Sequence, residues 1–181
     1  MSTPRQPNPA KLVVGCFLNQ KHLLEKLVGE LTSQFGSIDL ISSWMPFDYT
    51  SYYEKEMGTP LFRRVFAFQR LIQQSDLAGI KLSTNQIEQK YSRNGDRRAN
   101  IDPGYLLAER FVLASGKNYS HRIYLADGIY ADLTLIYHNG GFQQLPWTYP
   151  DYADRPMLTI LECVRAKYIL DLKQHLKDNV K

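Results

Sequence analysis

The stretch HRIYLADGIYADLTLIY, residues 121–137, decides the fold class of this chain. Apolar side chains alternate on both sides of the Asp-Gly pair at 127–128. Asp-Gly is a preferred pair for a two-residue type I′ turn, so the stretch predicts two antiparallel strands. An Asn-Gly pair at 139–140 turns the chain again into a strand over 142–145. The sequence therefore predicts a three-stranded meander over residues 121–145.

The beginning of the chain predicts a strand, a helix and a second strand. The run KLVVGCFL, residues 11–18, is continuously apolar after its lysine, which is typical of a strand buried on both faces. Asn19 can then cap a helix over residues 20–34, and Gly36 ends it. A second strand follows over residues 38–44.

The middle of the chain contains a further strand and a further helix. Residues 64–71 alternate partly between apolar and polar side chains, which favours a strand. Ser83 or Thr84 can cap a helix that reaches about Tyr91. The polar residues 92–99 that follow are expected to be a loop.

The last part of the chain completes the predicted architecture. Asp102 followed by proline is typical of a helix start, so we expect a helix over residues 106–114, although its dense apolar residues leave a strand possible. Asp154 can cap the last helix. Together the elements indicate one α+β domain over residues 11–177, after a flexible lead of residues 1–10. We expect a two-layer sandwich, in which the helices pack on one face of a mixed, mostly antiparallel sheet.

Composition and motifs narrow the possible functions. The 181 residues are 44% apolar and 22% charged, as in ordinary globular proteins, and the net charge of +4 permits an anionic partner. The chain contains no GxxxxGK[ST] loop, no GxGxxG after its first strand, no HExxH and no GxSxG. These absences argue against P-loop and Rossmann nucleotide sites, zinc proteases of the HExxH type and α/β-hydrolases.

The cysteines and the hydropathy pattern predict the compartment. Cys16 and Cys163 both lie among apolar neighbours, which is typical of buried free thiols in a reducing compartment. The N-terminal residues lack the apolar core of a signal peptide, and no run of apolar residues is long enough to span a membrane. We therefore expect a cytoplasmic protein without a membrane partner.

The hairpin provides the first candidate site. A two-residue turn would pair Ile123 with Asp132 and His121 with Thr134, which puts His121 and Asp132 on one face and Arg122 on the other. A histidine oriented by an aspartate is a usual arrangement for a general base, so His121 and Asp132 are candidate catalytic residues. The alternative is the solvent-facing polar side of an antiparallel sheet.

The second candidate site is the predicted helix start at Asp102. Its free N–H groups could bind an anion, and Lys117, Ser120 and Arg122 follow closely enough to form a phosphate- or carboxylate-binding corner. In the alternative, the Asp102 carboxylate is used entirely as a helix cap. Tyr105 belongs to the same segment and is a candidate ligand contact.

Two aromatic loops provide the third candidate site. Tyr53, Glu54 and Glu56 form an acidic turn that could hold a divalent cation or supply an acid and a base, with Glu54 as the candidate catalytic carboxylate. The alternative is a charged loop anchored by its tyrosines. Tyr149 and Tyr152 lie on a proline-rich loop, where they could stack on a base.

The arginine doublet is the remaining candidate. Arg63 and Arg64 follow the aromatic turn and open the strand over 64–71. The doublet either caps the end of that strand or faces the same cleft as the loops. In the second case Arg64 becomes a ligand contact.

Several unusual stretches resemble a known family. They are PF (46–47), YYEKEMG (52–58), DPGYL (102–106), SHRIYL (120–125), DGIYA (127–131) and PWTYPDY (146–152). In these stretches, and from about Lys11 to Tyr168, the chain resembles the bacterial family catalogued as domain of unknown function 4416. The family has no established activity to carry over. Some members bear the label "GTP-binding protein", but this sequence has neither a P-loop nor an [NT]KxD guanine motif.

Three functions remain open at this point. The first is a cytoplasmic enzyme or binding protein for a small anionic or phosphate-containing ligand such as a nucleotide, bound between the three candidate segments. The second is an RNA- or protein-binding module without chemistry, which would use the basic surface and exposed aromatic rings. The third is a structural subunit of a homo-oligomer whose aromatic loops form the interface.

Overall fold

The computed structural model describes residues 2–178, so Met1 of the predicted lead lies outside them. The described strands are β1 (Ala10–Leu18), β2 (Ile38–Ile41), β3 (Met45–Pro46), β4 (Phe62–Ile72), β5 (Ala99–Leu106), β6 (Arg110–Ser115), β7 (Arg122–Ala126), β8 (Ile129–His138) and β9 (Gly141–Gln144). The α-helices are α1 (Leu24–Phe35), α2 (Glu54–Met57), α3 (Leu77–Lys90), α4 (Pro150–Ala153) and α5 (Arg155–Asp178). Short 3-10 helices, η1 (Lys21–Leu23) and η2 (Gln74–Asp76), precede α1 and α3.

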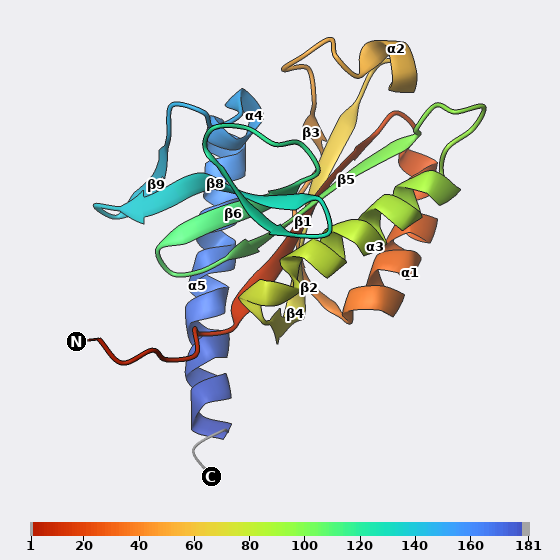
Figure 1. Cartoon of the computed structure of the whole chain (residues 1–181). Helices are drawn as coiled ribbons and strands as arrows, with labels where there is room; N and C mark the ends of the chain where they lie inside the picture. Colours follow the sequence, from red (N-terminus) through yellow and green to blue (C-terminus); the bar gives the residue numbers. More distant parts are fainter. Residues whose placement is uncertain (1, 179–181) are drawn as a thin grey trace.

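Within residues 2–178 the strands form a single nine-stranded sheet, in the order β2-β4-β1-β5-β6-β8-β7, with β3 beside β4 and β9 beside β8 (Figure 1). Neighbouring strands run antiparallel. The predicted α+β class and the antiparallel character of the sheet are confirmed. The division into residues 1–10 and 11–177 stays a prediction.

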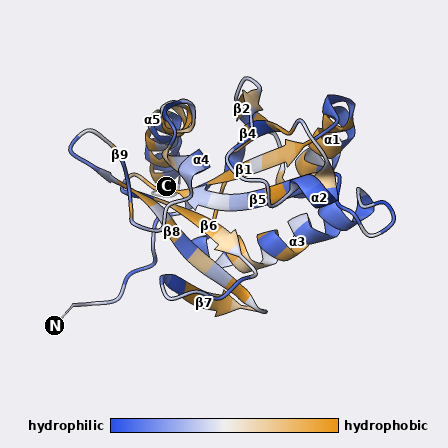
Figure 2. Ribbon diagram, turned by 90° about the horizontal axis from the view of Figure 1, so that it is seen from above, coloured by the Kyte–Doolittle hydropathy of each residue, from blue (hydrophilic) through white to orange (hydrophobic). Residues whose placement is uncertain are grey.

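Strand β1 lies at the centre of the core and is buried at all nine of its positions. The prediction of a strand over residues 11–18 is thus confirmed. Figure 1 shows α5 behind the sheet and α1 and α3 in front of it. In Figure 2 the apolar colour follows β1 and β6 between these helices, whereas α2 is polar. A strand between two helical layers has no exposed face, which explains its continuous apolar sequence.

The helices therefore cover both faces of the sheet, and the expectation of helices on one face is corrected. Lys11 of β1 shows which side α5 covers, because its Nζ lies 2.6 Å from Asp39 Oδ2 and 2.6 Å from Asp171 Oδ2 in α5. On the other side, Lys90 of α3 forms an ion pair with Glu30 of α1. The sheet thus lies between a layer formed by α5 and a layer formed by α1 and α3, and β1 has almost no contact with solvent.

The predicted hairpin is present, but its register differs from the expected one. Asp127 and Gly128 have φ values of +51° and +76°, as a type I′ turn requires, and Ala126 pairs with Ile129. An irregularity between Tyr124 and Ala126 then shifts the pairing by one residue. The shift follows from a bulge, which places two residues opposite one.

The bulge changes which side chain faces the candidate aspartate. Arg122, and not Ile123, pairs with Asp132, so Arg122 shares the face of Asp132 instead of lying on the opposite face. The second turn is as predicted: Asn139 and Gly140 both have positive φ and lead into β9.

The predicted helix over residues 106–114 is wrong, because this segment forms the end of β5 and most of β6. Asp102 is therefore a strand residue and caps no helix, and the proposed anion site at a helix N-terminus does not exist there. Gly104 helps to explain why this segment forms a strand that pairs with β5. A Cβ on Gly104 would lie 2.5 Å from the Val112 carbonyl oxygen, so the residue allows β5 and β6 to approach closely.

Other predicted boundaries also shift. Helix α3 begins at Leu77, and the hydroxyls of Ser83 and Thr84 donate to carbonyls inside the helix instead of capping it. Asn19 donates to the Met57 carbonyl and makes no cap hydrogen bond, because a 3-10 turn precedes α1. Strand β2, predicted to reach position 44, ends at Ile41, although the Ser42 N–H still donates to the Val65 carbonyl of β4.

Of the remaining predictions about helix termini and thiols, some are confirmed and one is wrong. Gly36 ends α1 with a φ of +90°, and the Asp154 carboxylate accepts a hydrogen bond from the Arg155 N–H at the start of α5, as predicted. Cys16 is buried, but Cys163 is exposed, since it lies on the outer side of α5. No helix within residues 2–178 is both long enough and apolar enough to cross a membrane.

We predict that Gly104→Ala lowers the free energy of unfolding by more than about 2 kcal/mol, because its Cβ meets backbone that cannot move without separating β5 from β6. Urea unfolding measures the change. Gly79→Ala is the matched control, since a Cβ there meets nothing within 4 Å and alanine favours the helix by about 0.5–1 kcal/mol. Equal stability of Gly104→Ala and the wild type would contradict the steric explanation.

Candidate functional site

The sheet opens between β5 and β6. The two strands pair only at residues 104–106 of β5 and 111–113 of β6, whereas β5 remains paired with β1 along its whole length. Residues 99–103 therefore have an edge without a partner strand. An opening of this kind exposes backbone groups, which are costly to leave unpaired when buried.

Two side chains of helix α3 form hydrogen bonds with unpaired backbone groups on the open edge of β5. The Ile101 N–H donates to Glu88 Oε1 at 2.5 Å, and Lys81 Nζ donates to the Ile101 carbonyl at 2.9 Å. The backbone groups of Pro103, two residues further on, lie on the same edge of the strand as those of Ile101, and proline has no N–H that needs a partner. Lys81 and Glu88 provide part of the hydrogen bonding that a partner strand would give to this edge.

A cavity of about 730 Å³ lies at this opening. Its aromatic side chains come from β1, from the segment between β3 and α2, and from the loop before α5: Phe17, Phe47, Tyr49, Tyr52, Tyr53, Tyr149 and Tyr152. Its charged side chains are of both signs: Lys81, Arg97, Lys117 and Arg122, with Glu88, Asp102, Asp132 and Asp151. The cavity thus combines stacking surfaces with charged groups, as small-molecule sites commonly do.

Strand register explains why distant residues meet in this cavity. Gly104 pairs with Leu113, Leu113 with Asp132, and Asp132 with Arg122, so one row of side chains crosses three strand boundaries on a single face. In the neighbouring row Gly15 pairs with Asp102. Because directly opposite residues share a face, the side chains of both rows point toward the same cavity.

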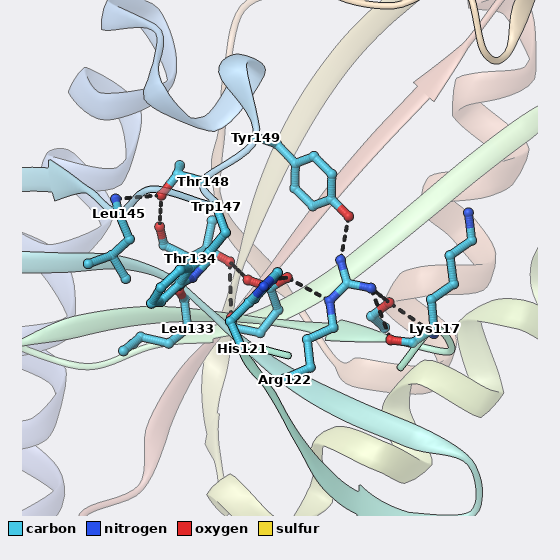
Figure 3. Close-up of polar contacts among 11 residues, drawn as sticks. Lys117, His121, Arg122, Leu133, Thr134, Leu145, Trp147, Thr148 and Tyr149 are labelled. Carbon is cyan, nitrogen blue, oxygen red and sulfur yellow. Dashed lines mark hydrogen bonds and ion pairs between the residues drawn. The ribbon is translucent and has the colours of Figure 1, made fainter. Parts of the chain in front are cut away.

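Arg122 holds the cavity wall together. Its Nε donates to Asp132 Oδ2 at 2.9 Å, and its Nη1 donates to the Ser115 hydroxyl at 3.1 Å and to the Lys117 carbonyl at 2.9 Å. Its Nη2 donates to the Tyr149 hydroxyl, and Figure 3 shows the guanidinium between Tyr149 and the Lys117 backbone. Since most of its donors are used, the main function of Arg122 is to connect β7 with β8, with the segment after β6 and with Tyr149.

His121 and Asp132 lie close together, as predicted from the hairpin. His121 Nε2 is 3.2 Å from Asp132 Oδ2. The His121 ring stacks on Trp147, with ring centroids 4.9 Å apart and planes 10° apart (Figure 3). His121 does not line the cavity, and its ring is covered by Trp147. A catalytic role for this pair stays a prediction.

Arg63 is buried beside the cavity, where it contacts two lining residues of the segment before α5. The Arg63 guanidinium forms an ion pair with Asp151 and lies 4.4 Å from the centroid of the Tyr152 ring. Burial raises the pKa of the Tyr152 hydroxyl, so this group carries its proton at neutral pH. Among the described residues the Tyr152 hydroxyl has no hydrogen-bond partner. It therefore has unused hydrogen-bonding capacity beside the Arg63 guanidinium.

A chain of hydrogen bonds connects α2 with β5. Arg97 donates to both carboxylate oxygens of Glu56 and to Asn100 Oδ1, and Asn100 Nδ2 donates to Asp102 Oδ2 at 2.7 Å. The hydrogen bond from Arg97 holds the pKa of Glu56 below its usual range. Glu56 is consequently an ionised carboxylate whose charge is already balanced.

The predicted divalent cation has little support from this arrangement. Glu54 is exposed and does not line the cavity, and Glu56 is bound by Arg97. The part of the chain that the structure describes contains no group of three or more His, Cys, Asp or Glu side chains that could hold a metal. Of this acidic turn, Tyr53 lies in the cavity, where burial raises its pKa.

The structure brings together most of the predicted ligand contacts and excludes three. Those that line the cavity are Tyr53, Asp102, Lys117, Arg122, Tyr149 and Tyr152. Arg64 pairs with Cys16 and packs on Trp44 on the other face of the sheet, whereas Arg63 lies behind the cavity and holds Asp151, which lines it. Tyr105 pairs with Leu12 on that same other face, and Ser120 is exposed outside the cavity.

Sequence reasoning missed Lys81, Glu88, Arg97 and Asn100. One signal was available for the first two. Lys81 and Glu88 are seven residues apart, on the same side of α3 as the buried residues Thr84 and Ile87. Charged residues on the apolar face of a helix are rarely left without a function in packing or binding.

The family model for a domain of unknown function, DUF4416, matches residues 8–168. The chain belongs to this family. The resemblance inferred from the sequence is confirmed, and the matched range contains every residue of the cavity in this DUF4416 protein. Comparisons with curated proteins and with solved structures found no match.

We predict that Glu88→Gln changes the pH dependence of stability in this DUF4416 protein. Burial raises the pKa of Glu88, so the folded state binds its proton more tightly than the unfolded state does. Stability from this group is full below the unfolded pKa of about 4.3 and is lost as the pH rises through the folded pKa. The unfolding free energy of Glu88→Gln should therefore rise relative to wild type between about pH 4 and 7.

Urea unfolding at several pH values measures this difference. Glu162→Gln is the control, because Glu162 is exposed on α5 and its neutralisation should leave the pH dependence unchanged. A difference between Glu88→Gln and wild type that stays constant or falls with rising pH would contradict the assignment.

Proposed function

We propose that this protein binds a small, ring-bearing anion, such as a nucleotide or another phosphate-containing metabolite, in the cavity between β5 and β6. The observation that carries the proposal is the combination of aromatic walls with a cation that has no ionic partner. A volume of about 730 Å³ lies within the range of about 300–1,000 Å³ that small-molecule sites occupy. The same site would suit either a binding protein or an enzyme.

Lys117 is the cation in question. Of the four cationic side chains that line the cavity, Arg97 is paired with Glu56, Arg122 with Asp132, and Lys81 donates to the Ile101 carbonyl. The Lys117 ammonium lies 4.9 Å from the centroid of the Tyr52 ring and has no ion pair within residues 2–178. An ammonium resting on an aromatic face is readily available to a phosphate or carboxylate.

The aromatic walls favour a ligand that contains a ring. Phe17 and Phe47 are buried and stack on each other with centroids 4.2 Å apart, so they form an apolar base. The rings that can offer a face to a ligand are the exposed ones, Tyr49, Tyr52 and Tyr149. Tyr53 and Tyr149 add hydroxyl groups at the border of the cavity. Planar aromatic surfaces of this kind stack on nucleobases and on the C–H faces of sugars.

The proposal includes a cytoplasmic location. Cys16 and Cys163 are both free thiols, and neither is joined to another cysteine. Free thiols are typical of reducing compartments.

The nucleic-acid alternative loses part of its support. Its basic surface includes two arginine doublets, Arg63-Arg64 and Arg97-Arg98. Arg63 is bound by Asp151, Arg97 by Glu56, and Arg98 by the Gln20 side chain. The two ion-paired arginines have few donors left for a phosphate backbone, whereas Arg98 keeps most of its donors, so this alternative is weakened only in part.

We predict that Lys117→Ala weakens binding of the anion about tenfold or more, because a charge-assisted contact to phosphate is lost. The test is a thermal-shift panel of GTP, GDP, ATP, CTP, ribose 5-phosphate, glucose 6-phosphate and inorganic phosphate on wild type. A ligand at about 100 times its Kd adds roughly 2.7 kcal/mol, which is a shift of several degrees at this size. Titration calorimetry of the compounds that give a shift then compares Kd values between the variants.

Lys173→Ala is the matched control, because Lys173 is exposed on α5 and distant from the cavity. Its affinity should equal that of wild type. A panel without any shift in wild type, or equal affinities of Lys117→Ala and Lys173→Ala, would refute the proposed site.

A second candidate function, the structural subunit of a homo-oligomer, is favoured by strand β7. This strand is the last in the sheet order, so one of its edges has no partner strand among the described residues. Its side chains Ile123 and Tyr124 are 69% and 59% exposed. An apolar edge strand can pair antiparallel with its copy across a two-fold axis.

We predict for this second function that Ile123→Lys abolishes self-association by placing a charge at the new interface. Sedimentation velocity at several concentrations measures the oligomeric state. Leu176→Lys, which changes an exposed leucine on α5, is the control and should sediment like wild type. A wild type that remains a monomer at every concentration would exclude this function.

A further inference from the structure

Asp102 differs from the other carboxylates of the cavity. Asp132 is held by Arg122 and His121, Asp151 by Arg63, and Glu88 by the Ile101 N–H. Asp102 accepts a single hydrogen bond among the described residues, at Oδ2 from Asn100. Its side chain is 31% exposed, so Oδ1 and the remaining lone pairs are open to the cavity.

The charge near Asp102 favours a neutral hydrogen-bond donor of a ligand over a cationic one. Lys81 Nζ lies 3.9 Å from Asp102 Oδ1, which is too far for a hydrogen bond but close enough to balance the negative charge. A ligand ammonium at this position would meet the Lys81 charge as well. A neutral hydroxyl meets no such repulsion and can donate to the carboxylate in a charge-assisted hydrogen bond.

Tyr152 provides a second polar group beside Asp102. Its side chain is 4% exposed, and its hydroxyl makes no hydrogen bond of normal geometry within residues 2–178, although the Arg63 guanidinium lies over its ring. A Cβ on Gly15 would lie 3.1 Å from this hydroxyl, and Gly15 is the cross-strand partner of Asp102. The phenol and the carboxylate therefore face the same short stretch of the β1–β5 pair. A buried unpaired hydroxyl is unfavourable unless a partner reaches it.

We infer that Asp102 and Tyr152 recognise the hydroxyl groups of a sugar, so that the ligand is a hydroxyl-bearing anion whose charged group contacts Lys117. This inference rests on the proposed function, since it uses the same cavity and the same anion contact. The ligand chemistry has two sources, a ribonucleotide or a sugar phosphate. In both, loss of the sugar hydroxyls leaves Asp102 with an unpaired acceptor.

The experiment compares each compound with its deoxy analogue on wild type and on Asp102→Asn. The nucleotide arm uses ATP, GTP and CTP with their 2′-deoxy and 2′,3′-dideoxy forms. The sugar arm uses ribose 5-phosphate and glucose 6-phosphate with their 2-deoxy forms. Titration calorimetry gives Kd for each combination. The dideoxy or deoxy form should bind wild type about tenfold or more weakly, and Asp102→Asn should remove most of that preference.

Asp127→Asn is the matched control, because Asp127 lies in the hairpin turn, where asparagine is equally suitable. It should keep the wild-type preference for hydroxylated ligands. Circular dichroism melting of Asp102→Asn without ligand checks that the variant is folded. If it is not folded, Tyr152→Phe, which removes the unpaired hydroxyl alone, takes its place in the comparison.

Each outcome has one meaning. Equal binding of hydroxylated and deoxy forms by wild type overturns the inference and leaves the anion site standing. A preference that survives in Asp102→Asn assigns hydroxyl recognition to other residues and overturns the inference as well. A response to inorganic phosphate alone, without added affinity from the sugar, has the same consequence. Absence of binding by the whole set refutes the proposed function itself.

Discussion

The loss of pairing between β5 and β6 beyond Gly104 is the constraint on which the rest of this structure depends. Strands that separate inside a sheet expose backbone groups, and here Lys81 and Glu88 of α3 bind the carbonyl and N–H of Ile101. The helix thereby replaces part of a missing strand. Because those hydrogen bonds are made, the sheet can keep an opening large enough for a ligand without losing the cooperation of its two halves.

The charged residues around the opening have two separate functions. Arg63, Arg97 and Arg122 each bind a carboxylate and connect a loop to the sheet, which orders the segments that carry the aromatic walls. Their charges are balanced, so they contribute little net potential. Lys117 and Asp102, which both line the cavity, remain incompletely paired, and the proposed ligand would use these two groups.

The errors of the sequence interpretation have identifiable physical causes. The run at residues 11–18 predicted a strand buried on both faces, and β1 is such a strand, yet the terminal helix was expected on the same face as the others. A doubly buried strand needs cover on both faces, so the two expectations were inconsistent. The Asp-Pro pair at 102–103 has the local pattern of a helix start. Proline is equally suited to a strand edge that faces an opening.

The sequence by itself determined the features that depend on local chemistry: the central buried strand, the type I′ turn at Asp127 and the gathering of Tyr53, Asp102, Lys117, Tyr149 and Tyr152 in candidate segments. The contact of His121 with Asp132 was expected from a register that the bulge changes. Only the tertiary structure decided the site. Register places Arg122 on the same face as Asp132, and it places Arg63 and Arg64 on opposite faces of the sheet. Packing brings Lys81 and Glu88 of α3 to the opening. Both depend on segments that are far apart in the chain. A one-residue change of register moves a side chain to the opposite face of a sheet, and no local pattern in the sequence specifies that register.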